Sequence, residues 1–132
     1  MIVGLRASVA AEVGEADTAA SLGSGDLPVL GTPRLLALAE AACVAAVAPH
    51  LADGQTTVGA AVSLEHKRPS LIGSTVEVQA ELSEIDDRKL FFVFVAYGPG
   101  AGDEAVIGAG TVQRVLVDRE RFMRKTGGSG PA

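Results

Sequence analysis

Residues 32–48 read TPRLLALAEAACVAAVA, and Pro49 follows directly. Thr32 and Pro33 predict a helix start, because threonine is a good N-cap and proline is favoured at the first helical position. Pro49 predicts the helix end. Between residues 35 and 48 the one charged residue is Glu40. A helix that is apolar on all sides is expected to be buried on all sides. The stretch therefore predicts a central helix of about sixteen residues, about 24 Å long at 1.5 Å per residue.

The chain on both sides of this helix has the two-residue period of β-strands. Residues 2–13 alternate loosely and predict an edge strand, and after a turn at 50–55 the pattern predicts strands at 56–65, 74–82, 89–97 and 104–117. Within 74–82, one face is apolar and is predicted to be core: Val76, Val78, Ala80 and Leu82. Residues 89–97 (KLFFVFVAY) are apolar on both faces, which predicts a central place in the sheet. Gly108 and Gly110 predict a bulge or the close approach of another backbone.

The order of the predicted elements indicates one compact fold. Residues 14–31 are rich in Gly, Ser, Asp and Ala and predict a long loop, of a length that often serves as a lid. We place a single domain at 1–125 and a disordered tail at 126–132 (TGGSGPA). Strand, loop, long helix and four strands predict an α+β hot-dog fold, in which a strongly curved antiparallel sheet wraps around one central helix. A cystatin-like or other open helix-on-sheet fold is the alternative, but an open sheet covers only one side of a helix.

Bulk properties exclude several classes of function. The formal net charge is −5, and the basic residues gather only in short groups such as Lys67-Arg68 and 119–125, so nucleic-acid binding is disfavoured. A short basic cluster can still hold a nucleotide phosphate. Cys43 is the one cysteine, which excludes an intrachain disulfide and favours a reducing compartment. The uncharged run 41–52 is too short to span a bilayer, and no signal-peptide pattern begins the chain. We expect a cytoplasmic protein without a membrane partner.

Three side chains invite a chemical role, and each also has a plain structural interpretation. An ionised carboxylate at Glu40 must be paired, protonated or facing a cavity, because burying it alone costs several kcal/mol. Arg34, six residues away, lies off the i+3/i+4 positions and is not its expected partner. A lone histidine at a strand end, such as His66, is more often a surface residue than a catalyst, and Cys43 lies among apolar residues that would raise its pKa. These residues alone leave the role of Glu40 open.

The helix also resembles a known family. Residues 31–51, with LAEAACV at 38–44 and APHL at 48–51, are similar to the helix of the fluoroacetyl-CoA thioesterase family of hot-dog proteins. In that family a Thr, a Glu eight residues later and a His twenty-six residues after the Glu form the catalytic set. Those spacings correspond to Thr32, Glu40 and His66, and Gly59 matches the family's glycine in the strand before its His. The similarity continues through Leu82 and the GAGT stretch at 108–111.

The resemblance implies a homodimeric hydrolase of a small acyl-CoA or related acyl thioester. It implies no metal and no cofactor apart from the coenzyme A of the substrate. Glu40 would act as base or nucleophile, His66 would move the proton, Thr32 would orient either of them, and a donor near Gly59 would serve the oxyanion. We expect Lys67 and Arg68 to bind substrate. One geometric difficulty follows, since Thr32 and Glu40 would lie about 12 Å apart on a straight helix.

One departure narrows the expected substrate. The fluoroacetate-specific enzyme of the family resembles a lidded pocket with aromatic residues shortly before its Thr, whereas residues 24–30 here read SGDLPVL. Fluoroacyl specificity is therefore not implied. Two alternatives stay open. One is a non-catalytic acyl-thioester binding protein that uses the same pocket. The other is a hydratase-like hot-dog enzyme, which usually pairs an Asp and a His in one short motif; no Asp lies within ten residues of His66.

Overall fold

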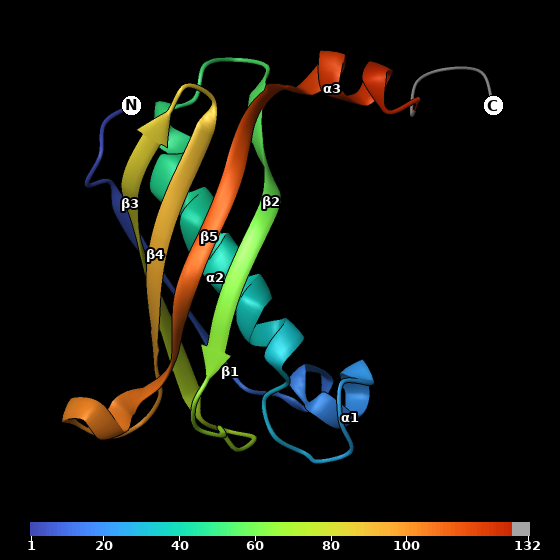
Figure 1. Ribbon diagram of the computed structural model, residues 1–132. Coiled ribbons are helices and arrows are strands. Elements are labelled where there is room, and N and C mark those ends of the chain that lie inside the picture. The colour runs from blue at the N-terminus through green and yellow to red at the C-terminus, as the bar shows by residue number, and fades with distance from the viewer. Residues whose placement is uncertain (128–132) are drawn as a thin grey trace.

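A five-stranded antiparallel sheet carries one long helix across its concave face (Figure 1). The computed structural model describes residues 1–127. The strands run in the order β1-β3-β4-β5-β2, and every neighbouring pair is antiparallel. Their bounds are β1 Arg6–Glu12, β2 Gln55–His66, β3 Thr75–Asp86, β4 Lys89–Tyr97 and β5 Val106–Asp118, and the long helix is α2, Thr32–Val47. The predicted hot-dog fold is confirmed, with β4 at the centre of the sheet.

Helix α2 forms where the sequence predicts it, with one difference at its start. Gly31 is the N-cap, and Thr32 is the first helical residue with Pro33 behind it. No side chain caps this end of the helix. The prediction that Thr32 is the N-cap of this helix is therefore wrong, and its hydroxyl does not cap the helix. After Val47 a 3-10 turn, η2 (Ala48–His50), ends the helix at Pro49.

The core lies between α2 and the concave face of the sheet. Seven side chains of α2 are buried there: Leu35, Leu38, Ala39, Ala42, Cys43, Ala46 and Val47. The face predicted for β3 is buried as well, with none of its four apolar side chains more than 3% exposed. The opposite face of α2 is exposed in the single chain, at Ala37, Ala41, Val44, Ala45 and Ala48. The expectation that the helix is buried all round is thus wrong for one chain, because a five-stranded sheet covers only one of its sides.

Strand β2 forms one edge of the sheet and comes from a stretch of small residues. Residues 59–63 (GAAVS) are exposed, and the pairing with β5 shifts by one residue between Gly59 and Ala61. The predicted close approach at the β5 glycines is confirmed: a Cβ on Gly110 would overlap the carbonyl oxygen of Ser63, and one on Gly108 would lie 2.9 Å from the carbonyl oxygen of Glu65.

Several shorter segments differ from the prediction. The loop 14–31 contains a 3-10 turn, η1 (Glu15–Asp17), and a short helix, α1 (Ala19–Leu22), which the hydroxyl of Thr18 caps. Residues Gly102–Ala105 form another 3-10 turn, η3, so the last strand begins at Val106. A further helix, α3 (Arg119–Lys125), follows β5 and is capped by Asp118. Of the predicted disordered tail, Thr126 and Gly127 close the last turn of α3 through backbone hydrogen bonds; residues 128–132 lie outside the described residues.

By length and composition alone, the segment Thr32–His50 could cross a membrane. The core helix of a soluble protein meets the same criterion, and one face of this helix packs in the core.

Candidate active site

Glu40 projects from the middle of α2 toward β2 and β5, where it meets an arginine. Nη1 of Arg114, on β5, donates to Oε2 of Glu40 over 2.8 Å. The Arg114 side chain is only 9% exposed, whereas that of Glu40 is 32% exposed. Two further donors of Arg114 are also satisfied, Nε by the hydroxyl of Thr57 and Nη2 by its carbonyl oxygen, each at 2.9 Å. The buried guanidinium is therefore paired and held in one orientation, and it fixes one oxygen of Glu40.

Gly59 makes room for this ion pair. It lies opposite Arg114 in the β2–β5 register and so faces the helix. A Cβ at this position would lie 2.5 Å from Oε2 of Glu40 and 3.4 Å from Nη1 of Arg114. Any side chain larger than hydrogen would consequently displace the carboxylate. The glycine that the family resemblance singled out thus has a steric reason in this chain.

Thr32 and His66 form a second pair, because α2 begins where β2 ends. The hydroxyl oxygen of Thr32 and Nδ1 of His66 are 2.8 Å apart, within hydrogen-bond distance. The other ring nitrogen, Nε2, is fully buried and has no hydrogen-bond partner among the described residues. Burial lowers the pKa of His66 below its ordinary value of 6.5, against a smaller opposing effect of a backbone hydrogen bond with Arg68. The imidazole is therefore neutral at pH 7, with one nitrogen oriented and the other unused.

The Thr32–His66 pair lines an open hollow of about 260 Å³. The loop before α2 forms one wall of this hollow, and the residues that follow β2 form another: Ala19, Ser24, Val29 and Leu30 on one side, Lys67, Arg68 and Pro69 on the other. Lys67 and Arg68 also border a neighbouring hollow of about 450 Å³ together with Asp103 and Val106. Two cations thus stand beside the histidine, where a negatively charged part of a ligand would be attracted.

The structure joins the expected residues into two pairs rather than one cluster. Within residues 1–127, no hydrogen bond connects Glu40 to Thr32 or His66, and the eight-residue spacing along α2 corresponds to about 12 Å. Arg34 pairs with Asp17 at 2.8 Å and not with Glu40, as predicted. Cys43 is a core residue, as predicted: it is completely buried, and burial raises its pKa to about 12.

Arg114 is the residue that sequence reasoning missed. Its register in β5 places it on the same face as Val112, which is 1% exposed, so it is a charge at a core-facing position. A charged residue two positions after a buried valine in a strand was the available signal. Among the described residues, no group of three or more His, Cys, Asp or Glu side chains is arranged to hold a metal ion.

We expect the His66 ring to titrate below pH 6.5 in an NMR pH titration, with His66→Gln assigning its signal against that of His50. A histidine whose pKa is lower in the folded than in the unfolded state destabilises the fold as it becomes protonated. Folding free energy should therefore be lost as the pH falls through 6.5 toward the pKa of the folded state, and His66→Gln should remove this part of the pH dependence. A ring that titrates at 6.5 or above would contradict the assignment.

Comparisons with known proteins identify the family of the chain. The family described as fluoroacetyl-CoA-specific thioesterase matches residues 13–120. A curated fluoroacetyl-CoA thioesterase of Streptantibioticus cattleyicolor is 36% identical over 104 residues, which cover 79% of this chain and 72% of that protein. A solved structure of a fluoroacetyl-CoA thioesterase variant in complex with acetyl-CoA superposes with a TM-score of 0.88 at 30% identity, over 99% of this chain and 100% of that one.

A more distant structure supports the fold alone. A thioesterase superfamily member of Thermus thermophilus has a TM-score of 0.84 at 22% identity and covers 96% of this chain and 93% of its own. The family match spans most of the chain and includes both pairs of side chains described above. The chain therefore belongs to the fluoroacetyl-CoA-specific thioesterase family and is a thioester hydrolase of the hot-dog fold.

Proposed function

We propose that the protein hydrolyses a small acyl-CoA, or a related acyl thioester, without a metal, with Glu40 as base or nucleophile. The observation that carries the proposal is a carboxylate with one oxygen fixed and the other free. Arg114 holds Oε2 of Glu40 against β2, and no hydrogen bond engages Oε1 within residues 1–127. The relative from Streptantibioticus cattleyicolor, named for fluoroacetyl-CoA hydrolysis, supports a thioester substrate.

Each side chain has a part in the proposed reaction. The free oxygen of Glu40 either takes a proton from water or attacks the carbonyl carbon, and backbone N–H groups near Gly59 stabilise the oxyanion. The leaving thiolate needs little help, since an ordinary thiol has a pKa of about 8.5. His66 relays to the thiolate the proton that Glu40 has taken from water, so that both side chains return to their starting states. The hydroxyl of Thr32 can donate to Nδ1 or accept from it, so either tautomer of the ring is held in place.

A second subunit would bring the two pairs together. The exposed stretch 59–63 of β2 is an uncharged free edge, and such edges tend to pair with another chain. Beside it lies the exposed apolar face of α2, where Val44 stands one turn after Glu40 on the same side of the helix. A two-fold axis near Ala61 would place the partner's His66 opposite Thr56, about three residues along β2 from Gly59. We therefore propose a homodimer whose two sites each take Glu40 from one subunit and the Thr32–His66 pair from the other.

The substrate follows from what surrounds the site. Lys67 and Arg68 would attract the phosphates of coenzyme A. Residues 24–30, of which Ser24, Val29 and Leu30 line the hollow, hold no aromatic side chain, so we propose a small acyl group without fluoroacyl specificity. We place the reaction in the cytoplasm, with no nucleic-acid or membrane partner and no cofactor beyond the coenzyme A of the substrate.

Glu40→Gln should abolish hydrolysis and leave the fold intact. The amide oxygen of Gln still accepts from Arg114, but it cannot take a proton, and losing general-base catalysis costs about 10²- to 10⁴-fold in rate. The measurement is thiol release over a panel of acyl-CoAs of increasing chain length. Asp17→Asn, which changes the separate pair with Arg34, serves as the control. A Gln variant that hydrolyses at the wild-type rate would refute the role of Glu40, and a wild-type protein that binds acyl-CoA tightly without releasing thiol would be a binding protein.

Gly59→Ala should impair catalysis far more than stability. The new methyl group would occupy the position of Oε2 of Glu40, and a carboxylate displaced by about 1 Å can lose about 10²-fold in rate. Gly14→Ala is the control, because the nearest atom to its Cβ, apart from neighbouring residues, would be 3.6 Å away. kcat and the thermal midpoint are compared for both variants. Equal kcat values for Gly59→Ala and Gly14→Ala would show that catalysis does not depend on the position of the Glu40 carboxylate.

Val44→Lys should dissociate the dimer and lower activity with it. Val44 is 40% exposed in the single chain, so a lysine there is tolerated unless a partner covers it. Val93, 45% exposed on the other face of the sheet, provides the matched control Val93→Lys, which should stay dimeric and active. Sedimentation velocity and thiol release report the two properties. An active wild-type monomer would overturn the shared site.

A further inference from the structure

Helix α3 is a basic arm that extends past the free edge of the sheet. In Figure 1 it continues from the end of β5 and lies beyond β2, away from the other strands. Its seven residues, RERFMRK, include four basic side chains and one acidic one. The acidic residue, Glu120, makes a loose pair with Arg124 at 3.9 Å, with both side chains well exposed. The remaining basic side chains of α3, those of Arg119, Arg121 and Lys125, form no ion pair within residues 1–127.

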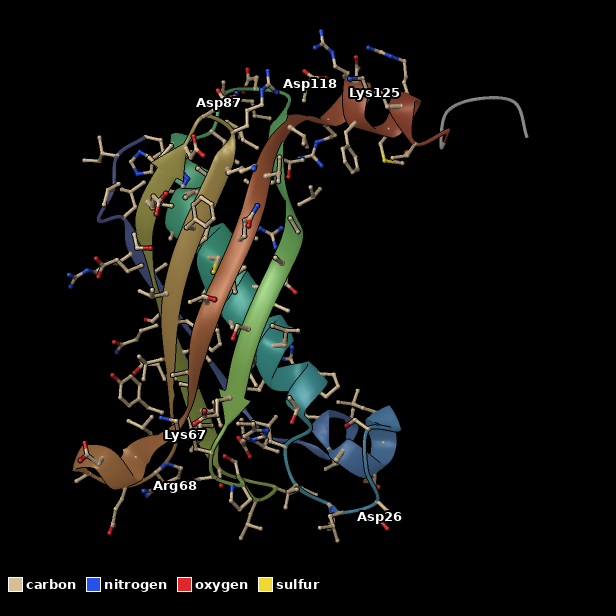
Figure 2. The ribbon with its side chains drawn as sticks, in the orientation of Figure 1. Asp26, Lys67, Arg68, Asp87, Asp118 and Lys125 are labelled. Carbon is tan, nitrogen blue, oxygen red and sulfur yellow. The ribbon has the colours of Figure 1, made fainter. Side chains whose placement is uncertain are left out.

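The basic pair Lys67-Arg68 lies at the opposite end of the molecule from α3. Figure 2 shows Lys67 and Arg68 at one end of the sheet and Lys125 at the other. Gln55, the first residue of β2, pairs with Asp118 directly before α3, whereas Lys67 directly follows the last residue of β2. The two clusters are therefore separated by the whole length of β2, about 36 Å for a twelve-residue strand at roughly 3.3 Å per residue. One chain cannot offer both clusters to one small ligand.

Two-fold pairing through β2 removes that separation. Antiparallel partners whose axis lies near Ala61, at the centre of the exposed stretch 59–63, place Gln55 of one subunit opposite the partner's Lys67. Because Gln55 stands beside the start of α3, this arrangement sets the arm over the end of the partner's β2. α3 projects past β2, on the side where the proposed partner subunit would pair with β2.

We propose that α3 of each subunit, with the partner's Lys67 and Arg68, forms a phosphate-binding site for the coenzyme A part of the substrate. This inference rests on the proposed function and on the dimer, and it assigns a binding role to Arg121, Arg124 and Lys125. Arginine binds phosphate oxygens through two parallel N–H donors, and cations gathered on an otherwise acidic protein concentrate an anionic ligand locally. The reacting thioester carries its phosphates at the far end of a long pantetheine arm, which matches cations at the rim of the site rather than inside it.

Charge reversal on α3 tests the role of the arm. The variant Arg121→Glu/Arg124→Glu should raise KM for an acyl-CoA by about tenfold or more and weaken binding of free coenzyme A in calorimetry. kcat, and both constants for the same acyl group on phosphate-free pantetheine, should not change. Arg88→Glu/Lys89→Glu, two exposed basic residues beside the β3–β4 turn at the same end of the sheet, is the control and should match the wild type. Unchanged KM for acyl-CoA, or an equal loss with the pantetheine thioester, would overturn the proposal.

Mixed dimers test whether the site is shared between subunits. Subunits carrying Arg121→Glu/Arg124→Glu are combined with subunits carrying Lys67→Glu/Arg68→Glu, and the heterodimer is isolated through two affinity tags. In the shared arrangement, one of its two sites has both intact clusters and the other has neither. The heterodimer should then bind coenzyme A at about half the wild-type stoichiometry with wild-type affinity. A heterodimer that binds as weakly as both parents would place the clusters in separate sites and overturn the proposal.

The two hypotheses fail in different ways. Calorimetry with coenzyme A does not depend on turnover, so a protein that never releases thiol but binds coenzyme A through α3 would refute the proposed hydrolysis and support the shared site. If the protein hydrolyses acyl-CoA and the α3 variants match the wild type, the proposed hydrolysis is supported and the shared site is refuted.

Discussion

The buried guanidinium of Arg114 requires hydrogen-bond acceptors from the elements around it. Burying an unpaired charge costs several kcal/mol, so a folded state with Arg114 in this position requires acceptors for its donors. Thr57 supplies two acceptors from the neighbouring strand, and Glu40 supplies the third from the helix. The ion pair therefore joins α2 to the edge of the sheet at a point where few other helix side chains reach the two strands. It also keeps the Glu40 carboxylate oriented among alanines.

The same interaction explains features of the backbone that would otherwise look like weaknesses. Gly59 weakens a strand by its lack of a side chain, yet any side chain would collide with the carboxylate. The one-residue shift in pairing directly after Gly59 frees backbone groups next to the carboxylate, and such irregularities are frequent beside active sites. β2 is therefore locally less stable at the place where a substrate carbonyl would need both a base and N–H donors.

The sequence predicted those elements whose signals are local. Proline at both ends and an apolar run interrupted only by Glu40 define α2 within a residue, and a strand apolar on both faces had to be β4, in the middle of the sheet. The pairing of Glu40 with Arg114 could not be predicted this way, because the two residues are 74 positions apart and their contact depends on how β5 is placed in the sheet. Nor could the Thr32–His66 contact, because it needs α2 to begin where β2 ends. The all-round apolar helix misled the prediction of burial, since its second side has no cover in one chain.

The small side chains on the exposed side of α2 affect how this helix can pack. Only 4% of the residues are aromatic, and the exposed apolar face that runs along α2 to Ala48 consists of four alanines and one valine. Small side chains let a neighbouring backbone approach this face of the helix closely. The exposed alanines thus leave a flat apolar face on which a second helix of the same kind can pack.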